Sequence, residues 1–250
     1  MYNRADEHIE YIDDRLRLIV SPAHTFGTDA LLLAAFSMPK RNAACVDFGT
    51  GCGIIPFYWL REGVNEVHAV EIQPLACSQL RRSIELNGLK NRLMLTEGDL
   101  TQLKGVLPFG AFDTVCMNPP YTPAGSGILS SSAADKTARH ETQLTFNGLC
   151  RAASELLRFG GSFCICLRPE RLTDAMCAMR ENKLEPKRLR FVAQRPGKAP
   201  WLFLLEGKKG RKSGLIVENT LYIENDDGSS SADMLKIIGT YKKDTQKQEN

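Results

Sequence analysis

Alternating glycines follow one of the apolar runs of the sequence. The run leads into Asp47-Phe-Gly49-Thr-Gly51-Cys-Gly53 and then into an apolar segment with helical spacing from Ile54. Glycines at alternate positions let the backbone approach a ligand closely, and the first turn of a helix offers unpaired N–H groups. The loop therefore predicts a nucleoside-cofactor site, and the alternative is a structural turn.

An acidic residue follows this loop at the distance expected of a ribose-binding carboxylate. Glu71 lies twenty residues beyond Gly51, at the end of the next apolar run, where it can accept hydrogen bonds from both ribose hydroxyls. The D-x-G-x-G-x-G spacing differs from the dinucleotide fingerprint and resembles motif I of class I S-adenosylmethionine-dependent methyltransferases. This resemblance implies S-adenosyl-L-methionine as the cofactor, with the glycine loop at its methionine end and Glu71 on its ribose.

The same resemblance implies roles for four more residues. Asp99 would bind the adenine amine, and Thr28 would approach the methionine group of the cofactor. Ile72 and Leu100 directly follow the two acids and are expected in the same pocket. As sequence features alone, Asp99 and Thr28 also fit helix caps, so capping is the alternative for both.

The tetrapeptide Asn118-Pro119-Pro120-Tyr121 ends another apolar run. Two consecutive prolines lack N–H groups and fix φ, which leaves the carbonyls before them available as acceptors. The Asn118 side-chain oxygen and the Pro119 carbonyl could accept both hydrogens of a planar NH2 group, while Tyr121 stacks on the group that carries it. These acceptors favour a pyramidal nitrogen whose lone pair attacks the methyl group, so positioning replaces a strong base. The alternative is a Pro-Pro turn.

This tetrapeptide matches motif IV of amino-methyltransferases that act on adenine N6, guanine N2 or glutamine N5. Together with other segments in order, over about residues 8–241, it resembles the bacterial tRNA(Val) adenine-N6-methyltransferases, which modify adenosine 37 of the anticodon loop. The resemblance implies tRNA as the partner, and Asn118 is expected to contact the cofactor as well as the target amine. The additional segments are 10–14, 26–33, 138–141, 168–172, 185–188 and 205–207.

Three other functions remain as alternatives. Protein glutamine-N5-methyltransferases share the tetrapeptide but usually carry a helical domain before motif I, and only about 42 residues precede it here. Guanine-N2 methylation of rRNA uses the same tetrapeptide. A binding module without catalysis would not need Asn118 beside a cofactor loop.

Positive charge is concentrated in residues 187–212, which contain nine basic residues and one acid, a net charge of +8, whereas the other 224 residues sum to −5. Such a concentration predicts a surface that binds the RNA backbone, with a merely solvated surface as the alternative. Arg139 and His140 follow the expected substrate loop and could grip a phosphate or order that loop. The candidate RNA-binding residues of the basic segment are Lys187, Arg188, Arg190 and Lys208.

Short apolar runs alternate with helical segments through most of the chain, which predicts βαβ units and a parallel sheet covered on both faces. With the resemblance, the expected fold is a Rossmann-like class I methyltransferase, an α/β doubly wound, mostly parallel sheet with an antiparallel last strand. A short helix over 30–37 is expected to have Thr28 or Asp29 as its N-cap. The predicted strands are 44–48, 67–71, 93–97, 112–117, 161–167, 187–192 and 201–206, and the other helices are 73–86, 144–158 and 172–181.

The chain is expected to form a single domain over residues 1–250. An extension over 1–42 would pack on the cofactor site, 43–206 would form the Rossmann-like core, and 207–250 would be a C-terminal extension. The longest apolar run, 30–36, is too short to cross a membrane and the N-terminus lacks a signal-peptide pattern, which predicts a cytoplasmic protein. Eight cysteines without C-x-x-C spacing predict reduced thiols and no metal site. The pattern does not indicate an oligomeric state.

Overall fold

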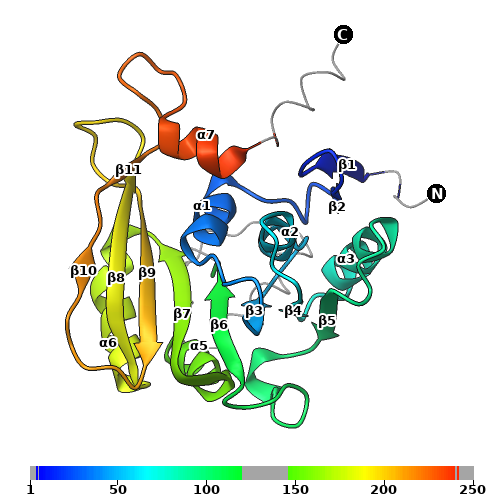
Figure 1. The fold of residues 1–250 in the computed structure, drawn as a ribbon, viewed down its shortest axis with the longest axis horizontal. Helices are drawn as coiled ribbons and strands as arrows, with labels where there is room; N and C mark the ends of the chain where they lie inside the picture. The colour runs from blue at the N-terminus through cyan, green and yellow to red at the C-terminus, as the bar shows by residue number, and fades with distance from the viewer. Residues whose placement is uncertain (1–3, 5, 120–145, 240, 242–250) are drawn as a thin grey trace, which may run out of the picture.

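The computed structural model describes residues 4, 6–119, 146–239 and 241 (Figure 1). Its centre is a nine-stranded sheet in the order β10-β8-β9-β7-β6-β3-β4-β5, with β11 also paired to β8. The strands are β3 (Cys45–Phe48), β4 (Val67–Glu71), β5 (Leu93–Glu97), β6 (Phe112–Met117), β7 (Leu157–Leu167), β8 (Leu184–Ala193), β9 (Leu202–Lys209), β10 (Ile216–Val217) and β11 (Leu221–Tyr222).

The sheet is parallel except for β9, which runs antiparallel to both of its neighbours, β7 and β8. The expected mostly parallel sheet with an antiparallel last strand of the core is therefore confirmed, and β9 lies inside the sheet rather than at its edge. From β3 the chain proceeds outward through β4 and β5, and then returns to place β6 on the other side of β3. The order of strands thus reverses between β3 and β6, where open α/β sheets bind ligands beyond the carboxyl ends of their strands.

Helices cover both faces of this sheet (Figure 1). One face packs against α1 (Thr28–Phe36), α2 (Ile54–Arg61) and α3 (Pro74–Leu86), and the other against α5 (Phe146–Leu156) and α6 (Leu172–Glu181). Strand residues alternate between the two cores: Cys45 belongs to the first, and Val46 and Phe48 belong to the second. Since alternate residues share a face, Asp47 lies on the α1–α3 side with Cys45.

The N-terminal hairpin and the C-terminal helix pack on the α1–α3 side. The hairpin of β1 (His8–Tyr11) and β2 (Arg17–Val20) lies along α3, where the Ile19 N–H donates to Ser83 Oγ at 3.0 Å. The C-terminal helix α7 (Ala232–Ile238) contacts α1, and Tyr241 Oη donates to Glu10 Oε2 at 3.1 Å. The two extensions therefore meet each other as well as the core.

The structure corrects the predicted boundaries of two helices, and β8 and β9 extend beyond their predicted ranges of 187–192 and 201–206. Helix α1 begins at Thr28, and Gly27 rather than Thr28 or Asp29 occupies the N-cap, without a side-chain capping bond. The predicted helix 144–158 extends too far, because Leu157 pairs with Phe112 and already belongs to β7. Helix-compatible spacing continues into this strand, so only the pairing partner reveals its start.

All eight cysteine thiols are free, as expected, and seven of them are buried. No helix in the part of the chain that the structure describes is long and apolar enough to cross a membrane.

Candidate active site

The glycine loop and the Asn-Pro segment meet at the carboxyl edge of the sheet. Phe48, the last residue of β3, is paired in register with Met117, the last residue of β6. Gly49 and Asn118 therefore begin neighbouring loops at the point where the strand order reverses. This arrangement brings together the two motifs that sequence analysis assigns to the cofactor and to the target amine.

Gly53 shows why this loop needs glycine. Its φ is +95°, in the left-handed region, and a Cβ added there would lie 2.5 Å from Leu80 Cδ1. Any side chain at this position would be strained and would clash with the buried Leu80 side chain of α3. The amino end of α2 is therefore held close to α3 and directly follows the loop.

Glu71 ties the glycine loop to the beginning of α3. Its carboxylate is 2% exposed, and Oε2 accepts a hydrogen bond from the Gly51 N–H at 2.7 Å. Its Oε1 accepts from the N–H groups of Ile72 and Gln73 at 2.9 and 2.8 Å. A carboxylate has about four acceptor positions, so these three bonds leave capacity for a ribose hydroxyl.

Asp47 is a buried carboxyl that lacks a hydrogen-bond partner among the described residues. It is 1% exposed, and both of its side-chain oxygens are unpaired. Burial, with a smaller contribution from the negative charge of Glu71, raises the pKa of Asp47 to about 8. The Thr50 hydroxyl opposes this rise in pKa, although its oxygen also lacks a partner that meets hydrogen-bond geometry. An unpaired buried carboxyl is costly, and a cationic group of a ligand would relieve that cost.

The remaining predicted cofactor residues lie around the same edge. Asp99 caps the short 3₁₀ helix η1 (Leu100–Gln102) by accepting from the Thr101 N–H at 2.8 Å through Oδ1. Its Oδ2 has no partner among the described residues, so capping and ligand binding are compatible. Ile72 and Leu100 are half-buried, whereas Thr28 is exposed in the first turn of α1.

Asn118 is held by two side chains that the motif search did not identify as functional. Its Nδ2 donates to Asp29 Oδ2 at 3.1 Å, and the Cys166 thiol donates to its Oδ1 at 3.1 Å. In the sequence, Asp29 is recognisable only as a possible helix cap and Cys166 only as one of eight reduced thiols. The pairing of Met117 with Ile165 places Cys166 beside Asn118, so the missing signal was the strand order.

Of the other residues predicted in the tetrapeptide and near the substrate loop, only Pro119 is described by the structure. Pro119 is buried at the end of β6. Pro120, Tyr121, Arg139 and His140 lie outside the described residues. No cluster of three or more potential metal ligands occurs within the described ranges.

The predicted RNA-binding arginines make intramolecular contacts. Arg188 Nη2 donates to the Phe36 carbonyl at 2.6 Å, and its guanidinium forms ion pairs with Glu206 and Glu218. Arg190 Nε donates to the Asn219 carbonyl at 3.0 Å, and the same guanidinium pairs with Asp233. These two side chains connect β8 to α1 and to the C-terminal extension.

The two predicted RNA-binding lysines lie toward the opposite edge of the sheet from Asn118. Lys187 is near the start of β8 and Lys208 is near the end of the antiparallel β9. Lys208 Nζ lies 3.5 Å from Glu206 Oε1, and Lys187 Nζ donates to the Lys212 carbonyl at 3.4 Å. The structure thus does not bring these residues to the predicted target site.

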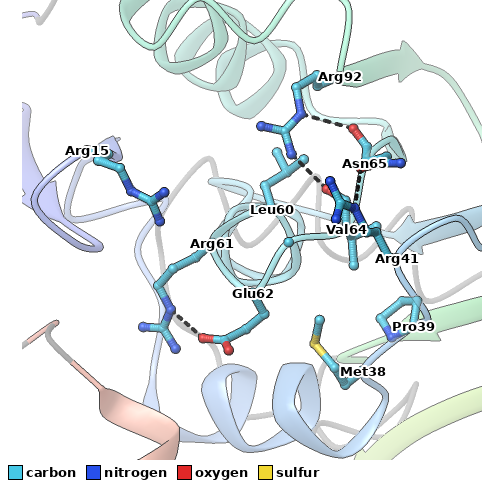
Figure 2. A pocket seen from close by; sticks show the side chains of 11 residues that line it. Arg15, Met38, Pro39, Arg41, Leu60, Arg61, Glu62, Val64, Asn65 and Arg92 are labelled. Atoms are coloured by element: carbon cyan, nitrogen blue, oxygen red, sulfur yellow. Dashed lines mark hydrogen bonds and ion pairs between the residues drawn. The ribbon is translucent and has the colours of Figure 1, made fainter.

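Residues that precede β3, β4 and β5 contribute to the lining of a cavity of about 480 Å³, whose side chains are shown in Figure 2. The cavity therefore lies at the amino edge of the sheet, away from Asn118. Its lining includes four arginines, which already bind other parts of the protein. Arg61 donates to the carbonyls of Ile237 and Ile238, and Arg92 donates to those of Val64 and Asn65. Arg15 pairs with Asp13, and Arg41 Nε donates to Asn65 Oδ1 at 3.3 Å. These contacts account for the arginines structurally, and the cavity is separate from the predicted cofactor site. The lining residues are Arg15, Met38, Pro39, Arg41, Leu60, Arg61, Glu62, Gly63, Val64, Asn65 and Arg92.

The strand order, the glycine loop and the Asn-Pro segment at the strand reversal define a protein of the Rossmann-like methyltransferase class. Residues 25–181 match the family described as "Methyltransferase small domain", and the chain belongs to this family.

Similar proteins agree with this assignment. A Shewanella woodyi protein named tRNA1(Val) (adenine(37)-N6)-methyltransferase is 26% identical over 218 residues, which cover 84% of this chain and 89% of the relative. A predicted O-methyltransferase of Agrobacterium tumefaciens has a similar structure, with a TM-score of 0.69, 22% identity and coverage of 86% of this chain and 97% of that one. Geranyl diphosphate C-methyltransferase of Streptomyces coelicolor A3(2), solved with S-adenosyl-L-homocysteine, has a TM-score of 0.52 and 12% identity, and covers 72% and 76%. The two solved structures show similarity of fold.

Proposed function

We propose that this protein uses S-adenosyl-L-methionine to methylate the N6 amine of an adenosine in tRNA, at position 37 of the anticodon loop of a valine tRNA. The observation that carries the proposal is Asn118, which follows β6 at the strand reversal directly beside the glycine loop. The name of the Shewanella woodyi relative supports the choice of adenine and of tRNA.

The residues present fit this cofactor. The unpaired carboxyl of Asp47 suits the ammonium of its methionine part, and the remaining acceptor capacity of Glu71 suits a ribose hydroxyl. Asp99, with Oδ2 lacking a partner among the described residues, would accept from the adenine amine, while Ile72 and Leu100 flank the ring. Thr28, in the first turn of α1, would contact the methionine end. The bound cofactor would supply an electrophilic methyl group on a sulfonium.

The chain itself would position the target nitrogen. The Asn118 Oδ1 and the Pro119 carbonyl would accept the two N6 hydrogens, while Pro120 fixes the backbone and Tyr121 stacks on the adenine. Because the acceptors draw both hydrogens to one side, they favour a lone pair directed at the methyl group. An anticodon-loop base is already unpaired and can enter a pocket at low cost, which suits this substrate.

RNA contacts form a separate part of the proposal. Arg139 and His140 would grip a phosphate near the target base. Lys187 and Lys208 would bind the RNA backbone farther away. Arg188 and Arg190 already pair with acidic residues, so each would bind a phosphate in addition to its present partner.

Methyl transfer to several substrate classes tests this function. Purified protein is incubated with methyl-labelled cofactor and bulk tRNA, bulk rRNA or total protein in parallel, and labelled RNA is digested to nucleosides. Label in N6-methyladenosine from tRNA is the expected result, and the Asn118→Ala variant should give none. Label in N2-methylguanosine from rRNA, or in glutamine of protein, would replace the proposed substrate.

A further inference from the structure

Asp29 lies in the first turn of α1, 89 residues before Asn118 in the sequence, and its carboxylate contacts the Asn118 side chain. We propose that Asp29 is a positioning residue that determines which side of the Asn118 amide faces the target amine. This inference rests on the proposed function, in which Asn118 Oδ1 accepts a hydrogen from that amine.

The hydrogen bonds of Asn118 define one orientation of its amide. A carboxylate can only accept, so Asp29 Oδ2 binds the NH2 side of the amide, at 3.1 Å. A rotation of the amide by half a turn would place its oxygen against this carboxylate, which is electrostatically unfavourable. The same rotation would point two donors at the target amine, which presents hydrogens. Asp29 therefore favours the one orientation that can bind the substrate.

Cys166 is a weaker partner on the other side of the amide. Its thiol donates to Asn118 Oδ1 at 3.1 Å, but an S–H group is a weak donor and the amide oxygen has two lone pairs. This contact therefore takes only one of the two lone pairs. The charged partner, Asp29, contributes more to the orientation than the thiol does.

Gly27, two residues before Asp29, leaves space for the Asp29 carboxylate. A Cβ added to Gly27 would lie 2.6 Å from Asp29 Oδ1, so a glycine there leaves room for the carboxylate. The φ of Gly27 is −110°, which any residue can adopt, and space rather than backbone conformation explains the glycine. The N-cap position of α1 has no side-chain capping bond, even though an acidic residue stands two positions later.

The negative charge of Asp29 should also stabilise the transition state of methyl transfer through Asn118. The target nitrogen becomes positively charged as it gains the methyl group. A carboxylate that accepts from Nδ2 increases the electron density on Oδ1, which then binds the N–H groups of this nitrogen more strongly in the transition state. Loss of Asp29 should therefore lower kcat more than it changes substrate binding.

Four variants test the proposal by steady-state kinetics with tRNA. Asp29→Ala should lower kcat by about 10- to 100-fold, as expected for loss of a hydrogen bond to a charged group, with the KM for tRNA and the Kd for cofactor within about threefold of wild type. Asp29→Asn, whose amide oxygen can still accept from Nδ2 but carries no charge, should recover only part of the activity. Gly27→Ala should lower kcat in the same direction by displacing the carboxylate. Asp174→Ala is the matched control, because Asp174 is also an acid in the first turn of a helix, α6, but pairs with Arg171 just before that helix.

A measurement that does not need activity separates this inference from the proposed function. In ¹⁵N-labelled protein the Asn118 side-chain NH2 signal, assigned by its loss in Asn118→Ala, should be slow to exchange with solvent. That protection should decrease in Asp29→Ala and be unchanged in Asp174→Ala. An unchanged signal or an unchanged kcat in Asp29→Ala would overturn the positioning role, even if Asn118→Ala is inactive. If Asp29→Ala changes the protection of Asn118 as expected but the wild type methylates no RNA, only the proposed function is rejected.

Discussion

Replacement of Asp47 by Asn tests the cofactor site, because only the wild-type carboxyl can ionise there. The substitution keeps the shape of the side chain and removes its ionisation. Burial raises the pKa of the wild-type carboxyl from its ordinary value of 3.8 to about 8. Folding at pH 7 must then protonate a group that is ionised in the unfolded chain, which costs about 4 kcal/mol at about 1.4 kcal/mol for each pH unit.

This shift in pKa has a defined effect on stability. Between about pH 4 and pH 8 the folded protein holds one more proton at Asp47 than the unfolded chain, so the free energy of unfolding falls as pH rises through this window. The contribution of Asp47 is fully present below pH 4 and is lost by about pH 8. In Asp47→Asn this contribution is absent, so the difference between the two unfolding free energies should change by about 1.4 kcal/mol per pH unit.

Binding of the cofactor should reverse the protonation of Asp47. A ligand ammonium beside the carboxyl favours its ionised form, so binding at pH 7 should release a proton from the wild type. The affinity should then weaken up to about tenfold for each pH unit below 8. Asp47→Asn should release no proton and should bind at least about tenfold more weakly at pH 8, since it lacks the charge-assisted partner.

Two assays measure these effects. Urea unfolding of both proteins without cofactor, at pH 5 to 8, gives the difference in stability, with Asp174→Asn as an exposed-carboxyl control. Isothermal titration calorimetry in two buffers of different ionisation enthalpy gives the number of protons released on binding. Equal pH dependence of stability in wild type and Asp47→Asn would refute the raised pKa of Asp47. If stability shows the raised pKa but the wild type binds cofactor without proton release, the assignment of an ammonium partner to Asp47 is refuted.

Three further predictions follow from the same geometry. Asn118→Ala should lower methyl transfer by about 10² to 10³-fold, as for other preorganised transition-state contacts, without weakening cofactor binding in calorimetry; an active variant would contradict the role of the tetrapeptide. Gly53→Ala should lower the free energy of unfolding by about 2 to 4 kcal/mol, because backbone strain adds to a clash with Leu80. Gly63→Ala, at a similar φ of +96° but with open space around it, should lower it by only about 1 to 2 kcal/mol. Equal losses in urea titrations would contradict a contribution from the clash with Leu80. Neutralising Lys187 and Lys208 together should reduce the slope of log K against log salt for tRNA binding by about 0.7 to 0.9 per lost contact, and an unchanged slope would assign both lysines to a solvated surface.

Local patterns in the sequence were sufficient to predict several strands and helices of the core. Strands 67–71, 93–97 and 112–117 and helix 172–181 have the predicted bounds. Their apolar spacing and the glycine or polar residues at their ends are short-range signals that folding does not override. The glycine loop and the Asn-Pro segment were likewise recognisable because each combines residue types that serve a specific chemistry.

The N-terminal hairpin and α7 were not predicted, because short amphipathic segments acquire their structure from what they pack against. Tertiary structure alone places β9 between β7 and β8, and strand pairing across long loops leaves no local signature. The same applies to Asp29, Asn118 and Cys166, which belong to a helix turn, the end of β6 and the end of β7. The sequence by itself thus determined which groups could bind a cofactor and an amine. Only the packing of α1 against neighbouring strands decided how Asn118 is oriented, because a hydrogen bond depends on distance in space and not on separation along the chain.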